Sequence, residues 1–253
     1  MGQQATPVRT AGLGKAVGPV PTAVSGAVLL LPGGEEVSAR RPSPVRATLA
    51  LRSLGRRLAR AGREEGLAVH TVHYRCRGWN GSEAQLAADA EWAADEVVRR
   101  YGDVPVCLVG VDMGGRAALR AGGHEAVNSV VALAPWLPED DVAAPAEPVK
   151  QLVGRRVLIV HGTNDERTDP ELSFRFAARA KKVNREVCRF EVHSDGHRLQ
   201  GHRDEVACLA IDFMRGALFG HSLSRPVEDA LAAPPPIGLR MPLAAGFGKS
   251  LKR

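Results

Sequence analysis

The segment Gly110-Val111-Asp112-Met113-Gly114-Gly115 has the clearest chemical potential in the chain, because it lies between an apolar run and a helical pattern. A tight turn from a strand into a helix strains its central residue and lifts that side chain above the sheet. Glycines are needed on both sides because a Cβ atom there would collide with the turn. The pattern predicts a nucleophile elbow that presents the carboxylate of Asp112.

Around this elbow, from about Gly26 to Gly220, the chain resembles the α/β-hydrolases, specifically the small, lid-poor, dienelactone-hydrolase-like kind. Residues 157–165 resemble the strand and loop that deliver the acid of a catalytic triad, and residues 195–197 resemble the loop that delivers the histidine. Residues 32–34 occupy the place of the oxyanion loop. The order nucleophile, acid, histidine is the order that this fold uses. His161, at a strand end, is more simply a structural hydrogen-bonding residue.

The resemblance implies a role for each residue. His197 would be the general base, and Asp165 would accept its imidazole N–H, fix the tautomer and stabilise the imidazolium. The oxyanion donors would be the backbone N–H of Met113 and one N–H from the loop that contains Gly33 and Gly34. The sequence shows neither a dinucleotide-binding fingerprint nor a phosphate-binding loop, so no cofactor is expected.

Asp112 departs from the family pattern, which has a serine at the elbow in esterases. Attack of a carboxylate on an ester would give an unfavourable mixed anhydride, whereas attack on a saturated carbon gives an alkyl ester that histidine-activated water then cleaves. Epoxide hydrolases and haloalkane dehalogenases resemble this chain in placing Asp at the elbow. Those families also carry a helical cap, for which the stretch from Leu137 to Gly154 is too short.

Three functions stay open at this point. The first is a hydrolase that uses Asp112, His197 and Asp165 on a small organic substrate with an ester, lactone or epoxide-like electrophile. The second is an esterase-like protein whose activity the aspartate has impaired, and the third is a small-molecule-binding module on the same scaffold. The retained elbow, acid and base favour a hydrolase.

Four further residues are weaker candidates for substrate binding: Tyr74, Arg75, Trp79 and Trp136. The first three follow a predicted strand, at the sheet edge where ligands bind in open α/β folds. Arg75 would pair with a substrate carboxylate, and Trp79 would form an apolar wall. A simpler interpretation is a solvated basic loop with one packed tryptophan.

The elements that must position these residues alternate along the chain. Continuous aliphatic runs predict strands at 27–31, 67–74, 104–111, 127–133, 156–160 and 187–192, and apolar residues at helical spacing predict helices over 44–61, 83–100, 113–121, 171–182 and 204–218. This alternation predicts an α/β-hydrolase fold with a mostly parallel sheet of about six strands, helices on both faces and no cap domain. The domain is expected over 25–220, between flexible tails at 1–24 and 221–253.

Composition narrows the classes of partner. The formal net charge is +6, of which residues 1–25 contribute +2 and residues 221–253 contribute +3, so the body of the chain carries only +1. This distribution argues against a nucleic-acid partner. No apolar run is long enough to span a membrane, and no Cys or His spacing suggests a metal site. None of the four cysteines forms a C-x-x-C pair, and Cys107 and Cys188 lie within apolar strand patterns. Buried free thiols of this kind favour a reducing cytoplasm.

Overall fold

The computed structural model describes residues 9–18, 22–41, 44–139 and 146–248, with the backbone alone for 44–50. Its sheet has eight strands in the order β1-β3-β2-β4-β5-β6-β7-β8. Only β1 runs antiparallel to its neighbour; the other pairings are parallel. The strands are β1 (Gly12–Leu13), β2 (Gly26–Leu31), β3 (Leu67–His73), β4 (Val106–Val111), β5 (Val127–Leu133), β6 (Arg156–Gly162), β7 (Val187–Val192) and β8 (Met241–Pro242).

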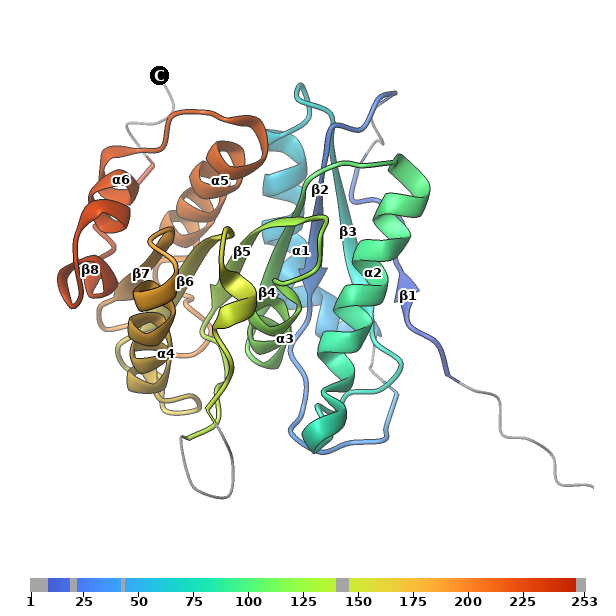
Figure 1. The fold of residues 1–253 in the computed structure, drawn as a ribbon, viewed down its shortest axis with the longest axis horizontal. Helices are drawn as coiled ribbons and strands as arrows, with labels where there is room; N and C mark the ends of the chain where they lie inside the picture. The colour runs from blue at the N-terminus through green and yellow to red at the C-terminus, as the bar shows by residue number, and fades with distance from the viewer. Residues whose placement is uncertain (1–8, 19–21, 42–43, 140–145, 249–253) are drawn as a thin grey trace, which may run out of the picture.

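Helices cover both faces of this sheet (Figure 1). One face packs against α1 (Pro44–Ala61), α5 (Arg203–Phe219) and α6 (Arg225–Ala232), and the other against α2 (Gln85–Tyr101), α3 (Met113–Ala121) and α4 (Pro170–Val183). Successive side chains of a strand point to opposite faces. In β2, for example, Ala27, Leu29 and Leu31 enter the core beneath α2 and α3, whereas Val28 and Leu30 enter the other core.

The predicted α/β architecture is confirmed, and the sheet has two more strands than the six expected. The additional strands, β1 and β8, contain two residues each at the edges of the sheet. So short a strand has no apolar alternation from which to predict it. Between β5 and β6 the only helical element among the described residues is the short 3-10 turn Lys150–Leu152, so the described residues there form no helical cap.

The predicted tails at 1–24 and 221–253 need correction. Residues 12–13 pair with β3, and residues 225–242 form α6, the 3-10 turn Ile237–Leu239 and β8. Val227 and Leu239 are completely buried. The sequence does not predict these elements, because their few buried residues are scattered among prolines and alanines without helical or strand periodicity. Residues 1–8 and 249–253 of the predicted tails lie outside the described residues. No described helix is long and apolar enough to cross a membrane.

Candidate active site

The turn from β4 into α3 has the strained geometry that the sequence predicts. Asp112 has φ 55° and ψ −126°, a conformation that L-residues rarely adopt. A Cβ on Gly110 would collide with the carbonyl oxygen of Gly114, and a Cβ on Gly114 would collide with the carbonyl oxygen of Leu31. Both glycines are therefore required for the turn to form against β2.

The three predicted catalytic residues meet at the carboxyl end of the parallel sheet. Asp112 follows β4, Asp165 lies in the loop after β6, and His197 lies in the loop after β7. His197 Nδ1 is 2.9 Å from Asp165 Oδ2, which is a hydrogen bond. His197 Nε2 is 3.8 Å from Asp112 Oδ1, which is a charge contact too long for a hydrogen bond.

Asp165 is held as a carboxylate by a dense set of donors. Its Oδ1 accepts the backbone N–H of Arg167 at 2.9 Å and that of Thr168 at 3.0 Å, and its Oδ2 accepts the Thr168 hydroxyl at 2.6 Å. Burial by itself would raise the pKa of Asp165, but hydrogen bonds from His161, Thr168 and His197 outweigh it and hold that pKa below its ordinary value. Asp165 therefore stays ionised, and an ionised acid can stabilise an imidazolium formed at His197.

His161 supports this arrangement from the interior. It is fully buried, with Nε2 at 3.1 Å from Asp165 Oδ2 and Nδ1 at 2.9 Å from the hydroxyl of Ser173 on α4. Its ring therefore ties the acid loop to a helix, as the structural interpretation of this residue expects.

Arg167 is a part of the site that the sequence did not reveal. Its guanidinium donates to Asp112 Oδ2 at 2.8 Å, although 61% of its side chain is exposed. Burial raises the pKa of Asp112 above its ordinary value, and the charges of Arg167 and His197 oppose that rise. Nothing in the sequence distinguishes Arg167 from a solvated loop residue, because its partner is 55 positions away.

Gly33 and Met113, two of the predicted oxyanion residues, lie beside the Asp112 carboxylate. A Cβ on Gly33 would lie 3.0 Å from Asp112 Oδ2, and the backbone N–H of Met113 acts to lower the pKa of the same carboxyl. Gly34 lies against the 74–79 loop, since its Cβ would approach the carbonyl oxygen of Arg77 to 2.6 Å. The loop after β2 is therefore placed beside the elbow, where the prediction puts it.

A cavity of about 520 Å³ opens beside the acid loop. Its walls include Trp136, Leu137, Leu172, Asp165 and Arg167. Trp136 also donates its backbone N–H to the carbonyl oxygen of Asp112 at 3.1 Å, which connects the cavity wall to the elbow. Of the four weaker substrate-binding candidates, Trp136 is the one that lies in this cavity.

Tyr74, Arg75 and Trp79 are not among the residues that line this cavity, and neither are Asp112 and His197. Arg75 is engaged by the fully buried Asp89 of α2, through its backbone N–H at 2.8 Å and its Nε at 2.5 Å. Trp79 is buried beneath the guanidinium of Arg116, 3.8 Å from its ring centroid. Tyr74 is buried, and its hydroxyl has no hydrogen-bond partner among the described residues. The pairing of Arg75 with the buried Asp89 holds this loop against α2, and the sequence pattern does not predict that pairing.

Comparisons with known proteins agree with this geometry at the level of the fold. No family model and no curated protein matches the sequence. Among solved structures, an esterase from Pyrococcus furiosus superposes with a TM-score of 0.58 at 16% identity, covering 77% of this chain and 83% of that one. A lid-less α/β serine hydrolase from Xanthomonas campestris gives 0.56 at 15% identity, covering 84% and 90%. The chain has the α/β-hydrolase fold.

A third solved structure, from Thermus thermophilus, gives a TM-score of 0.57 at 19% identity and covers 80% of this chain and 92% of that one. Identities this low establish the architecture and leave the chemistry to the site. Within the described part of the chain, no group of three or more His, Cys, Asp or Glu side chains is arranged to hold a metal ion.

Proposed function

We propose that this protein is a hydrolase in which Asp112 is the nucleophile, His197 the base and Asp165 the acid that supports it. The observation that carries the proposal is the continuous line of contacts from a strained, buried carboxylate through an imidazole to an ionised acid. Strain of this kind persists only where the surrounding structure enforces it, and it concentrates at functional sites. The resemblance in fold to an esterase and to serine hydrolases supports the class of reaction.

The substrate class that suits a carboxylate nucleophile is a saturated-carbon electrophile such as an epoxide. The Asp112 carboxylate forms a bond to carbon, the carbon–oxygen bond of the ring breaks, and the alkoxide takes a proton from solvent. Water then loses a proton to His197 Nε2 and attacks the carbonyl carbon of the alkyl ester, which releases a diol and restores the carboxylate. Asp165 stabilises the imidazolium until its proton returns to solvent.

The separation of 3.8 Å between His197 Nε2 and Asp112 Oδ1 fits this division of labour. A serine nucleophile needs a hydrogen bond to the base, whereas an ionised carboxylate has no proton to give. Because Asp165 holds the Nδ1–H, the Nε2 lone pair is left for a water molecule.

A second candidate is an impaired esterase-like or small-molecule-binding protein, and the surroundings of Asp112 support it. The carboxylate lies beside Gly33 and its ionised form is favoured by the Met113 N–H, where the carbonyl oxygen of an ester would be held. Arg167 also neutralises its charge. A protein with this site would bind a ligand in the cavity without turning it over.

A paired assay separates the two candidates. Wild type, Asp112→Ser and Asp112→Asn are tested on a panel of epoxides and a panel of p-nitrophenyl esters, with the exposed Asp103→Asn as a matched control. The proposal expects epoxide turnover in wild type and in the control, and its loss in Asp112→Asn. Ester turnover that arises only in Asp112→Ser, with no epoxide turnover in wild type, would instead establish the impaired esterase.

A further inference from the structure

The exposed side of α1 carries a concentration of arginine that the proposed function does not use. This helix contains five arginines and no acidic residue. Leu51 and Leu58 are buried against the sheet, whereas Arg52, Arg56 and Arg60 are exposed. The three exposed residues recur every four positions, so they form one ridge along the helix, which we call the arginine ridge.

The arginine ridge has no counter-charge among the described residues. Within the part of the chain that the structure describes, none of its three members makes an ion pair. The neighbouring Arg57, which is not part of the ridge, pairs with Asp204 of α5. On α2 and α3, by contrast, every arginine has a carboxylate partner within 4 Å. Like charges four residues apart oppose helix formation, and the ridge places them so twice. An anion bound along the ridge would relieve that repulsion.

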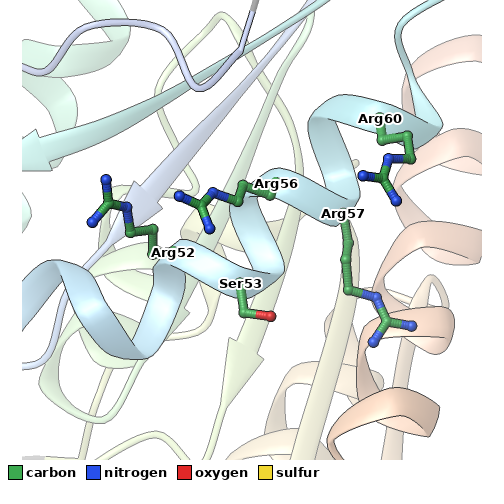
Figure 2. Close-up of a pocket in the computed structure, with 5 residues that line it drawn as sticks. All are labelled: Arg52, Ser53, Arg56, Arg57 and Arg60. Atoms are coloured by element: carbon green, nitrogen blue, oxygen red, sulfur yellow. The ribbon is translucent and has the colours of Figure 1, made fainter.

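These side chains also line a recess that is open to solvent. A recess of about 290 Å³ lies among Arg52, Ser53, Arg56, Arg57 and Arg60. Figure 2 shows Arg52, Arg56 and Arg60 extending from successive turns of α1, whereas Ser53 and Arg57 point toward the lower side of the helix. Each guanidinium is a planar fork that matches the oxygens of a phosphate group, and the serine hydroxyl adds a further donor.

We propose that this recess is a binding site for a small polyphosphate anion. Its lining has four cations and one hydroxyl, and it has no apolar or aromatic side chain. Recognition of an unpaired nucleic-acid strand relies on aromatic stacking, and a membrane-surface helix needs an apolar face, which α1 buries in the core. A duplex needs a footprint of about 600 Å² or more, which exceeds a recess lined by five residues. The phosphates of a compact anion fit the three unpaired guanidinium groups.

Calorimetric titration with inorganic tripolyphosphate, in a phosphate-free buffer of low salt, tests this site. Wild type is expected to bind. The triple variant Arg52→Gln, Arg56→Gln and Arg60→Gln is expected to bind at least about tenfold more weakly, because it loses three charged hydrogen-bond donors to the phosphate oxygens. The matched control removes three positive charges elsewhere, at Arg175, Arg179 and Arg185, each also replaced by Gln. It is expected to bind as wild type does.

Circular dichroism checks that each variant is folded, and the single Arg56→Gln variant replaces the triple if the latter is not. That single variant should still weaken binding several-fold. No binding to wild type at millimolar tripolyphosphate would overturn the proposal, as would equal weakening in the control. So would binding of duplex DNA or of anionic vesicles through the same arginines when tripolyphosphate does not bind.

Discussion

Asp112 combines a left-handed backbone, burial and a negative charge in a single residue. The strained backbone and the burial of the charge both oppose folding, and Arg167 and the Met113 N–H offset only part of the effect of burial. The site is therefore a place where the fold gives up stability for a pre-arranged carboxylate, as is common at functional residues. The consequences of this balance are measurable without any substrate.

Replacement of Asp112 by Asn should stabilise the protein at neutral pH. The folded-state pKa of Asp112 is raised, chiefly by burial, so its contribution to stability is fully present below the unfolded-state pKa and is lost as pH rises through the folded-state pKa. Asn keeps the shape and removes the charge. We expect a Tm a few degrees above wild type near neutral pH, with the difference disappearing below pH about 4. A lower Tm for the Asn variant at neutral pH would show that the ion pair with Arg167 outweighs burial.

Arg167 should set the acid limit of activity under the proposed mechanism. Its charge is the largest effect that opposes the burial of Asp112, so Arg167→Gln should raise the pKa of that carboxyl further. Because the nucleophile must be ionised, the acid limb of the kcat/KM profile should move to higher pH. Arg175→Gln, at an exposed position of α4, is the control and should leave the limb in place. An unmoved limb in the Arg167 variant would remove Asp112 as the group that titrates.

At the scale of elements, the six central strands and five long helices are predictable from sequence. Buried parallel strands must be aliphatic throughout, and the covering helices must repeat their apolar residues at helical spacing. The sequence also predicts the positions of the three candidate catalytic residues, because each lies shortly after a predicted strand: Asp112, Asp165 and His197. Arg167 and the inward pairing of Arg75 do not follow, since each depends on a distant partner that no local pattern specifies.

Glu147, which lies between β5 and β6, also has ion-pair partners that are distant in the sequence. Glu147 is buried and pairs with Arg116, whose Nε lies 2.6 Å from it, and with Arg120. The Arg116 guanidinium in turn lies over Trp79 and is 5.1 Å from the ring centroid of Trp136, the tryptophan of the cavity wall. Glu147 therefore fastens the connection between β5 and β6 onto α3.

Glu147→Gln should lower the free energy of unfolding by about 3 kcal/mol or more, because it leaves the buried Arg116 without its counter-charge. Unfolding in urea, followed by circular dichroism, measures this loss. Glu186→Gln breaks the half-exposed pair with Arg156 and serves as the control, with an expected change below about 1 kcal/mol. Equal losses in the two variants would contradict the anchoring role of Glu147.

At the scale of the whole molecule, the domain extends beyond the boundary that composition indicates. Lys181 on α4 donates to the carbonyl oxygens of Ala230 and Leu231 at 3.2 and 2.9 Å. The buried Arg189 of β7 donates to the carbonyl oxygen of Leu239 at 2.9 Å. Two cations inside the domain thus depend on backbone groups of a segment whose composition predicts a flexible tail.

Removal of residues 221–253 should therefore destabilise the protein strongly. It exposes the core beneath Val227 and Leu239, at about 1.5–3 kcal/mol for each side chain, and it leaves Arg189 without its carbonyl partner. For a chain of this size we expect a fall in Tm of at least about 5 °C. Removal of residues 249–253 alone is the control and should leave Tm unchanged, because the buried residues described in this segment all lie before residue 249. If both truncated proteins melt like the full chain, the C-terminal segment contributes nothing to the fold, and the domain ends near residue 220 as its composition indicates.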